Sequence, residues 1–105
     1  MSRLTISVDT FRMDTDKEAA LKPLEEAAEA FGAWQEYQRG YPFIAFDGCD
    51  VYKQRLADEI ADVIQAACNL ADRHGIDLQA AMERCEERNR TRGRYGATAI
   101  EAPDA

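Results

Sequence analysis

The segment from about residue 51 to residue 74 carries more apolar side chains than one packed helix face needs. At helical spacing, one stripe contains Leu56, Ile60, Val63, Ala67 and Leu70. Three more apolar residues, Ala61, Ile64 and Cys68, widen this surface well beyond a core stripe of roughly 100°. We therefore expect a long helix that is buried on two sides. In a chain of 105 residues the second side requires another subunit, so the sequence predicts a homodimer or a dimer of dimers.

A second helix is predicted upstream. Thr15-Asp-Lys-Glu18 has the form of a capping box, and apolar residues continue at helical spacing to about residue 39. Pro23 interrupts this segment, and a proline inside a helix costs ~3 kcal/mol. We therefore expect a short helix that ends near Leu21, followed by another with Pro23 at its first position.

Further signals mark the end of the long helix and the start of the next. Gly75 suits the left-handed residue that follows a helix, and Asp77 suits the cap of a last helix that runs to about Arg90. The predicted fold class is all-α, a helical bundle in a single domain over residues 1–105.

Three other segments lack helical spacing. Residues 1–13 contain the alternation Leu4-Thr-Ile6-Ser-Val8, which suits a short strand or an extended arm. Residues 40–50 combine glycine and proline with three aromatic residues and predict a loop. The segment 94–105 is small and polar, and we expect a flexible tail.

Charge and composition exclude several classes of protein. The chain has 20 acidic residues against 13 Lys and Arg, a net charge of −7, which disfavours binding to polymeric nucleic acid or to anionic lipid. Apolar residues make up 46 %, too many for a disordered acidic tail. No apolar stretch approaches the roughly 20 residues of a membrane span, and the N-terminus lacks the apolar core of a signal peptide.

The cysteine and histidine residues bear on the cellular compartment and on zinc binding. Cys49, Cys68 and Cys85 form no CxxC pair, so we expect reduced thiols in a cytoplasmic protein. With one histidine and no cysteine cluster, a zinc site is not expected.

Two acidic pairs are the main candidates for chemistry. Glu26-x-x-Glu29 lies in the first long helical segment and Glu59-x-x-Asp62 in the next. Residues three apart share a helix face, so antiparallel packing can bring the four carboxylates together. Such a group needs protons or cations, and Mg²⁺ or Mn²⁺ prefers oxygen ligands of this kind. The alternative is that these acids belong to solvated helix faces, which commonly carry such pairs.

The ordered set of motifs resembles a known family. It consists of Lys22-Pro-Leu-Glu25-Glu26-Ala-Ala-Glu29, then Glu59-Ile-Ala-Asp62-Val63, then Asn89-Arg-Thr-Arg92-Gly93. This order is similar to that of the MazG-like all-α nucleoside triphosphate pyrophosphatases, and the match spans residues 22–93. Cys85 stands where that family often has a lysine, so the corresponding phosphate contact is either missing or supplied from elsewhere, by Arg88 or Arg92.

The resemblance implies hydrolysis of a nucleoside triphosphate to the monophosphate and pyrophosphate, with Mg²⁺ or Mn²⁺ as cofactor. It implies that the metal ligands are Glu26, Glu29, Glu59 and Asp62. It also implies that a carboxylate among Glu25, Glu26 and Glu59 accepts the proton of the attacking water.

The resemblance further implies phosphate binding by Lys22, Asn89 and Arg92. For Arg92 the alternative is a solvated cationic turn favoured by the helix dipole. Asn69 would contact the sugar or base of the nucleotide, or instead make an interhelical hydrogen bond.

Two other functions remain open at this stage. One is phosphoribosyl-ATP pyrophosphatase activity, which belongs to the same superfamily. The other is a non-catalytic helical module, either an interaction domain whose acids only solvate it or a nucleotide sensor that binds without turnover.

Overall fold

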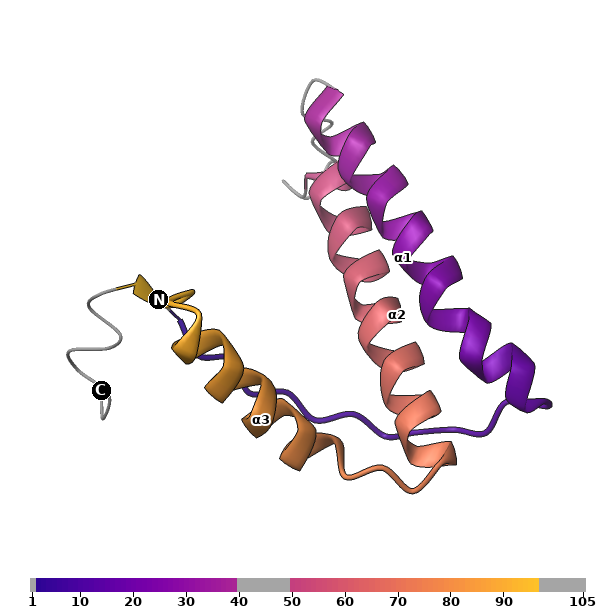
Figure 1. Cartoon of the computed structure of the whole chain (residues 1–105). Coiled ribbons are helices and arrows are strands. Elements are labelled where there is room, and N and C mark those ends of the chain that lie inside the picture. The colour runs from indigo at the N-terminus through magenta and orange to yellow at the C-terminus, as the bar shows by residue number, and fades with distance from the viewer. Residues whose placement is uncertain (1, 40–49, 97–105) are drawn as a thin grey trace.

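The computed structural model describes residues 2–39 and 50–96, and three helices dominate them (Figure 1). They are α1 (Asp16–Arg39), α2 (Val51–Arg73) and α3 (Leu78–Thr91). No strand forms within these two ranges, which confirms the predicted all-α class. Residues 2–13 are an extended arm rather than a strand. The predicted loop lies, apart from Asp50, outside the described residues, as do positions 97–105 of the predicted tail.

The ends of the helices follow the predicted local chemistry. The Thr15 hydroxyl accepts a hydrogen bond from the Glu18 amide at 3.1 Å, and the Asp77 carboxylate accepts one from the Ala80 amide at 3.0 Å. Gly75 has a φ of 62°, as expected for the left-handed residue after α2, and lets the Ile76 amide bond back to the Ala71 carbonyl at 2.9 Å.

The prediction that Pro23 divides the first helical segment is wrong. α1 is one uninterrupted helix of 24 residues, and Pro23 lies inside it. Proline removes one hydrogen bond, the one that would reach the Ala19 carbonyl. The helix packs against α2 on both sides of this defect, because Ala19 before it and Ala33 after it are each only 2 % exposed. Tertiary packing therefore offsets the local cost of the proline.

α1 and α2 lie side by side and antiparallel (Figure 1). Small residues are buried where they meet. On α1 the buried residues Ala19, Glu26 and Ala33 recur every seven positions, and on α2 Glu59 and the buried Ala66 share this interval. We call this row the alanine seam. A seven-residue interval keeps a narrow stripe on one partner helix, and alanine allows close approach of the two backbones.

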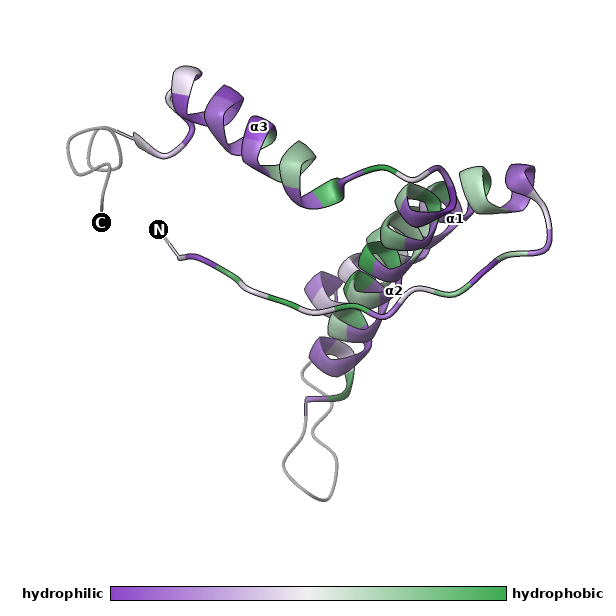
Figure 2. Ribbon diagram, turned by 90° about the horizontal axis from the view of Figure 1, so that it is seen from below, coloured by the Kyte–Doolittle hydropathy of each residue, from purple (hydrophilic) through white to green (hydrophobic). Residues whose placement is uncertain are grey.

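Larger apolar side chains lie mostly outside the seam. The buried apolar residues of the described chain are four alanines, at positions 19, 33, 66 and 71, and none of its large side chains is fully buried. Several large apolar residues are instead well exposed, among them Leu24, Phe31, Trp34, Ile60 and Met82. Apolar positions alternate with polar ones along α1 and α2 in Figure 2. Of the wide apolar surface predicted for α2, Ile60, Ala61 and Ala67 are exposed and the other five residues are only partly covered by the described residues.

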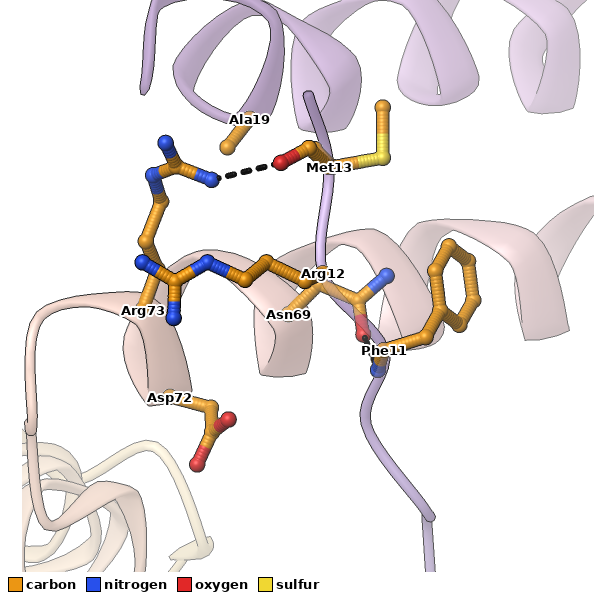
Figure 3. A pocket seen from close by; sticks show the side chains of 7 residues that line it. All are labelled: Phe11, Arg12, Met13, Ala19, Asn69, Asp72 and Arg73. Carbon is orange, nitrogen blue, oxygen red and sulfur yellow. Dashed lines mark hydrogen bonds between the residues drawn. The ribbon is translucent and has the colours of Figure 1, made fainter. Parts of the chain in front are cut away.

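The arm crosses the C-terminal half of α2, close to the first turn of α1. The Phe11 amide donates to Asn69 Oδ1 at 3.0 Å, and Arg73 donates to the Met13 carbonyl at 2.8 Å. Figure 3 shows the small pocket of about 60 Å³ at this junction, which Phe11, Arg73 and Ala19 help to line. Two side chains of α2, Asn69 and Arg73, thus hold the arm by hydrogen bonds to its backbone.

α3 leaves the end of α2 and extends away from the α1–α2 pair (Figure 1). Its packing on α2 is slight compared with that between α1 and α2. An ion pair between Arg3 and Glu86, 3.3 Å long, joins the beginning of the arm to α3. The arrangement is therefore an antiparallel helix pair with a third helix and an arm projecting beside it.

Candidate metal centre

The α1–α2 contact brings together three of the four predicted carboxylates. Glu26 and Glu29 come from α1 and Glu59 from α2, and one oxygen of each lies within 4.8 Å of the other two. The spacing of three residues places both α1 side chains over one turn, and the antiparallel partner presents Glu59 to that turn. This separation is short enough for the three side chains to ligate one cation.

Two oxygens of this group are buried and unpaired. Oε2 of Glu26 and Oε2 of Glu59 are shielded from solvent and have no hydrogen-bond partner. Glu26 as a whole is only 8 % exposed, which is unusual for a glutamate. A buried carboxylate oxygen without a donor is costly, so this site fits a group that supplies positive charge or a proton.

Lys22 supplies part of the compensating charge. Its Nζ lies 3.3 Å from Glu26 Oε1, one turn along α1, and 3.6 Å from Glu25 Oε2. The hydrogen bond to Glu26 and the negative charge of Glu26 raise the pKa of Lys22 above its ordinary value of 10.5. Lys22 therefore pairs with Oε1 of Glu26, whereas Oε2 of Glu26 has no partner.

The crowding of negative charge is also expressed in Glu29. The neighbouring Glu26 carboxylate raises the pKa of Glu29 above its ordinary value of 4.5, because it can accept a hydrogen bond from Glu29 only when Glu29 is protonated and repels the ionised form. Burial and the charge of Glu59 act in the same direction. Without a cation, a proton shared between Glu29 and Glu26 is the simplest relief of the repulsion.

Asp62 is the predicted ligand that lies outside this group. It is exposed on α2, and it does not join the three glutamates within 4.8 Å. Glu25 is also peripheral, because its side chain is 58 % exposed and pairs with Lys22. Three glutamates therefore lie close together in the structure, and Glu25 and Asp62 lie at the edge of this group.

The predicted phosphate-binding residues divide between two regions. Lys22 lies at the carboxylates, whereas Asn89 and Arg92 belong to α3 and its C-terminal cap. Among the described residues the Asn89 amide donates only to Cys85 Sγ, at 3.6 Å within α3, and Arg92 is exposed. Since α3 extends away from α1 and α2, one chain does not gather these side chains around the carboxylates (Figure 1).

Asn69 has a clear structural partner. It is 5 % exposed, and its Oδ1 accepts hydrogen bonds from the Phe11 amide and from Gln65 Nε2, at 3.0 and 2.9 Å. Neither bond is the interhelical one considered for it, because one reaches the arm and the other stays within α2. A buried asparagine on a helix indicates a hydrogen bond to another part of the chain. The spacing of residues along the sequence does not predict that its partner is the Phe11 amide.

One ion pair near the site escaped prediction. Arg55 of α2 donates to Glu36 of α1 at 3.1 Å, beyond the carboxylates along the same helix pair. Both residues are substantially exposed, so the pair contributes little to stability. The opposite charges of Arg55 and Glu36 would have predicted this pair once the two helices were assumed to be antiparallel.

None of the described helices combines the length and the apolarity that a transmembrane segment requires. Protein-family models, curated proteins and solved structures were each compared with the chain, and none matches it. The three-glutamate group and the order of the motifs are therefore the basis for a functional proposal.

Proposed function

We propose that this protein is a divalent-metal-dependent pyrophosphohydrolase that converts a nucleoside triphosphate into the monophosphate and pyrophosphate. The observation that carries the proposal is the pair of buried, unpartnered oxygens on Glu26 and Glu59, which face a common group with Glu29. The motif order from Lys22 to Arg92, similar to that of the MazG-like pyrophosphatases, supports the choice of reaction.

The residues present fit Mg²⁺ or Mn²⁺. Glu26, Glu29 and Glu59 would hold the ion, and Asp62 on the next turn of α2 is the remaining ligand of the motif. The donors are all carboxylate oxygens, which suits hard cations better than zinc or copper. When bound, the ion offsets the negative charge of the triphosphate and lowers the pKa of a bound water.

The chain's own residues have distinct parts in the hydrolysis. Water attacks the α-phosphorus, a new P–O bond forms, and the bond to the β-phosphate breaks so that pyrophosphate leaves. A carboxylate among Glu25, Glu26 and Glu59 takes the proton from the water. Lys22 orients Glu26 and offers positive charge to phosphate.

Charge makes a cation necessary for this substrate. The chain has a net charge of −7, so a triphosphate with about four negative charges is repelled at long range. Asn89 and Arg92 are proposed to contact the phosphates, and α3 must approach a carboxylate group for them to do so. A second copy of the chain could supply that approach.

We also propose that the protein is a homodimer whose interface includes the outer face of α1. Helical spacing places Leu21, Leu24 and Phe31 opposite Glu26, and they are 43, 69 and 58 % exposed. Large apolar side chains that gather exposed on one helix face are typical of a surface that a partner covers. Light scattering tests it: a monomeric mass at micromolar concentration contradicts the dimer.

The experiment for the activity is product analysis with a substrate panel. Ribonucleoside and deoxyribonucleoside triphosphates are incubated with the protein and Mg²⁺, and monophosphate and pyrophosphate are measured. Phosphoribosyl-ATP is included, because turnover of that compound alone would assign the protein to the other branch of the superfamily. Binding without any product would identify a nucleotide sensor.

Matched variants connect the activity to the carboxylates. Glu59→Gln keeps the shape of a site residue, and we expect it to lower kcat/KM by at least about 100-fold. Asp58→Asn makes the same chemical change one position earlier, where the carboxylate is exposed and accepts a hydrogen bond from Gln54. Equal rates for wild type and Glu59→Gln would remove the assigned site.

A further inference from the structure

Residues 4–8 of the arm are an extended segment with nothing paired to its backbone. Among the hydrogen bonds of residues 2–39 and 50–96, none uses an amide or carbonyl of residues 4–8. Leu4 and Ile6 are 85 and 62 % exposed, and Val8 is half-buried. An extended segment with free amides and carbonyls has the properties of an unpaired edge strand.

Contacts on both sides keep this segment in place. Before it, Arg3 pairs with Glu86 of α3 at 3.3 Å. After it, the Asp9 carbonyl accepts a hydrogen bond from Gln65 at 2.9 Å, and the Phe11 amide bonds to Asn69. Because the ends are fixed, pairing the segment with another strand costs less conformational entropy than pairing a free tail.

The sequence of the segment is complementary to itself when two copies run antiparallel. With Ile6 placed opposite Ile6 of a second copy, Leu4 faces Val8 and Thr5 faces Ser7. The apolar pairs then lie on one face of the ribbon and the hydroxyl pairs on the other, since side chains alternate along a strand.

Charge specifies the same register. Two strands centred on Ile6 place Arg3 opposite Asp9, in both directions. The Asp9 carboxylate makes no ion pair or hydrogen bond in the described part of the chain, and the Arg3 side chain is 80 % exposed. A shift of two residues would instead place Leu4 opposite Thr10, or Val8 opposite Ser2, and would separate Arg3 from Asp9.

We propose that residues 3–9 pair antiparallel with residues 3–9 of a second copy of this chain, with Ile6 opposite Ile6. The occupant is a second copy because the seven-residue pattern matches itself in hydropathy, hydroxyl groups and charge. An isolated ribbon this short is only marginally stable in water. The pairing rests on the homodimer proposed above, because chains that associate through their helices raise the local concentration of one arm near the other.

Disulfide trapping tests the register directly. In full-length protein with Cys49, Cys68 and Cys85 replaced by alanine, Ile6→Cys is expected to form a disulfide-linked pair under mild oxidation. Thr5→Cys alone and Ser7→Cys alone are expected not to form one. In the proposed register position 5 of one copy faces position 7 of the other, so two identical cysteines lie too far apart for a disulfide. A mixture of those two variants, equilibrated so that subunits exchange, should give the mixed disulfide.

Hydrogen exchange on the unmodified protein gives a second readout. Amides within residues 4–8 should be protected at high protein concentration and lose protection on dilution. Arg3→Asp should lower this protection about tenfold, because it opposes two like charges across the ribbon, and Arg3→Asp with Asp9→Arg should restore it. Glu86→Gln is the comparison, since it removes the Arg3–Glu86 and Arg90–Glu86 pairs without placing like charges across the ribbon, and it should lower protection less than Arg3→Asp does.

The outcomes separate cleanly. Efficient trapping of Ile6→Cys with no trapping of Thr5→Cys alone supports the register. Equal trapping of both variants, or amides 4–8 that exchange freely at every concentration, would overturn the pairing. Neither readout depends on catalytic activity, so the result is independent of the proposed hydrolysis.

Discussion

Removing one negative charge from the carboxylate group should stabilise the protein without metal and abolish its response to metal. The perturbation is Glu59→Gln. Glu26 and Glu59 oxygens lie within 4.8 Å of each other, and two unit charges at that distance repel by about 1 kcal/mol in bulk water and about 3.5 kcal/mol at an effective dielectric constant of 20. Lys22 compensates part of this through Glu26, so we expect a gain in unfolding free energy between these limits.

The assay is thermal unfolding, first in EDTA and then with Mg²⁺. A gain of 1 kcal/mol corresponds to about 4–8 °C for a domain of this size, so the variant should melt at least about 4 °C above wild type in EDTA. Mg²⁺ at 10 times its Kd adds about 1.4 kcal/mol to the wild type by linkage and much less to the variant. The difference between the two melting temperatures should therefore shrink or reverse when Mg²⁺ is added.

Asp58→Asn is the control, because it removes a neighbouring charge that lies outside the group. It should shift the melting temperature little and keep the Mg²⁺ response. If Glu59→Gln melts below wild type in EDTA, or if Mg²⁺ shifts both proteins equally, the reasoning from crowded carboxylates is refuted.

Three other predictions follow from local contacts. Because the pKa of Glu29 is raised, the folded metal-free protein binds more protons than the unfolded chain, so its stability should fall as pH rises above about 4.5; urea unfolding in EDTA across pH checks this, and a rise over that window contradicts it. Asn69→Ala should cost about 1–2 kcal/mol and speed exchange of the Phe11 amide, since that bond and the one from Gln65 are lost. Pro23→Ala should raise the unfolding free energy by about 1–3 kcal/mol in urea, because a hydrogen bond to Ala19 is restored; no gain would show that the proline is already accommodated.

The local features of the fold were predictable from short-range chemistry. Thr15, Asp77 and Gly75 act on residues within one turn, so their effects on helix ends can be read without tertiary structure. Pro23 was misjudged for the opposite reason. Its cost is local, but the compensating contacts of Ala19 and Ala33 with α2 come from a distant part of the sequence.

The site was predictable to the extent that it depends on helix periodicity. The spacing of Glu26 and Glu29, together with antiparallel pairing, was enough to bring Glu59 to them. The exposure of Asp62 depends on how far α2 is rotated about its axis, which spacing does not determine. The separate course of α3 likewise depends on packing between helices, and this left Asn89 apart from the group expected for it.

The alanine seam also bears on which ion the protein would prefer. Ala19 and Ala33 stand two turns before and after Glu26, so the distance between the two backbones near the carboxylates depends on methyl groups. Mg²⁺ binds oxygen at 2.0–2.1 Å and Ca²⁺ at 2.3–2.6 Å. A slightly larger side chain at Ala33 would move the backbones apart and widen the cage, so ion selectivity could change in evolution while every ligand stays the same.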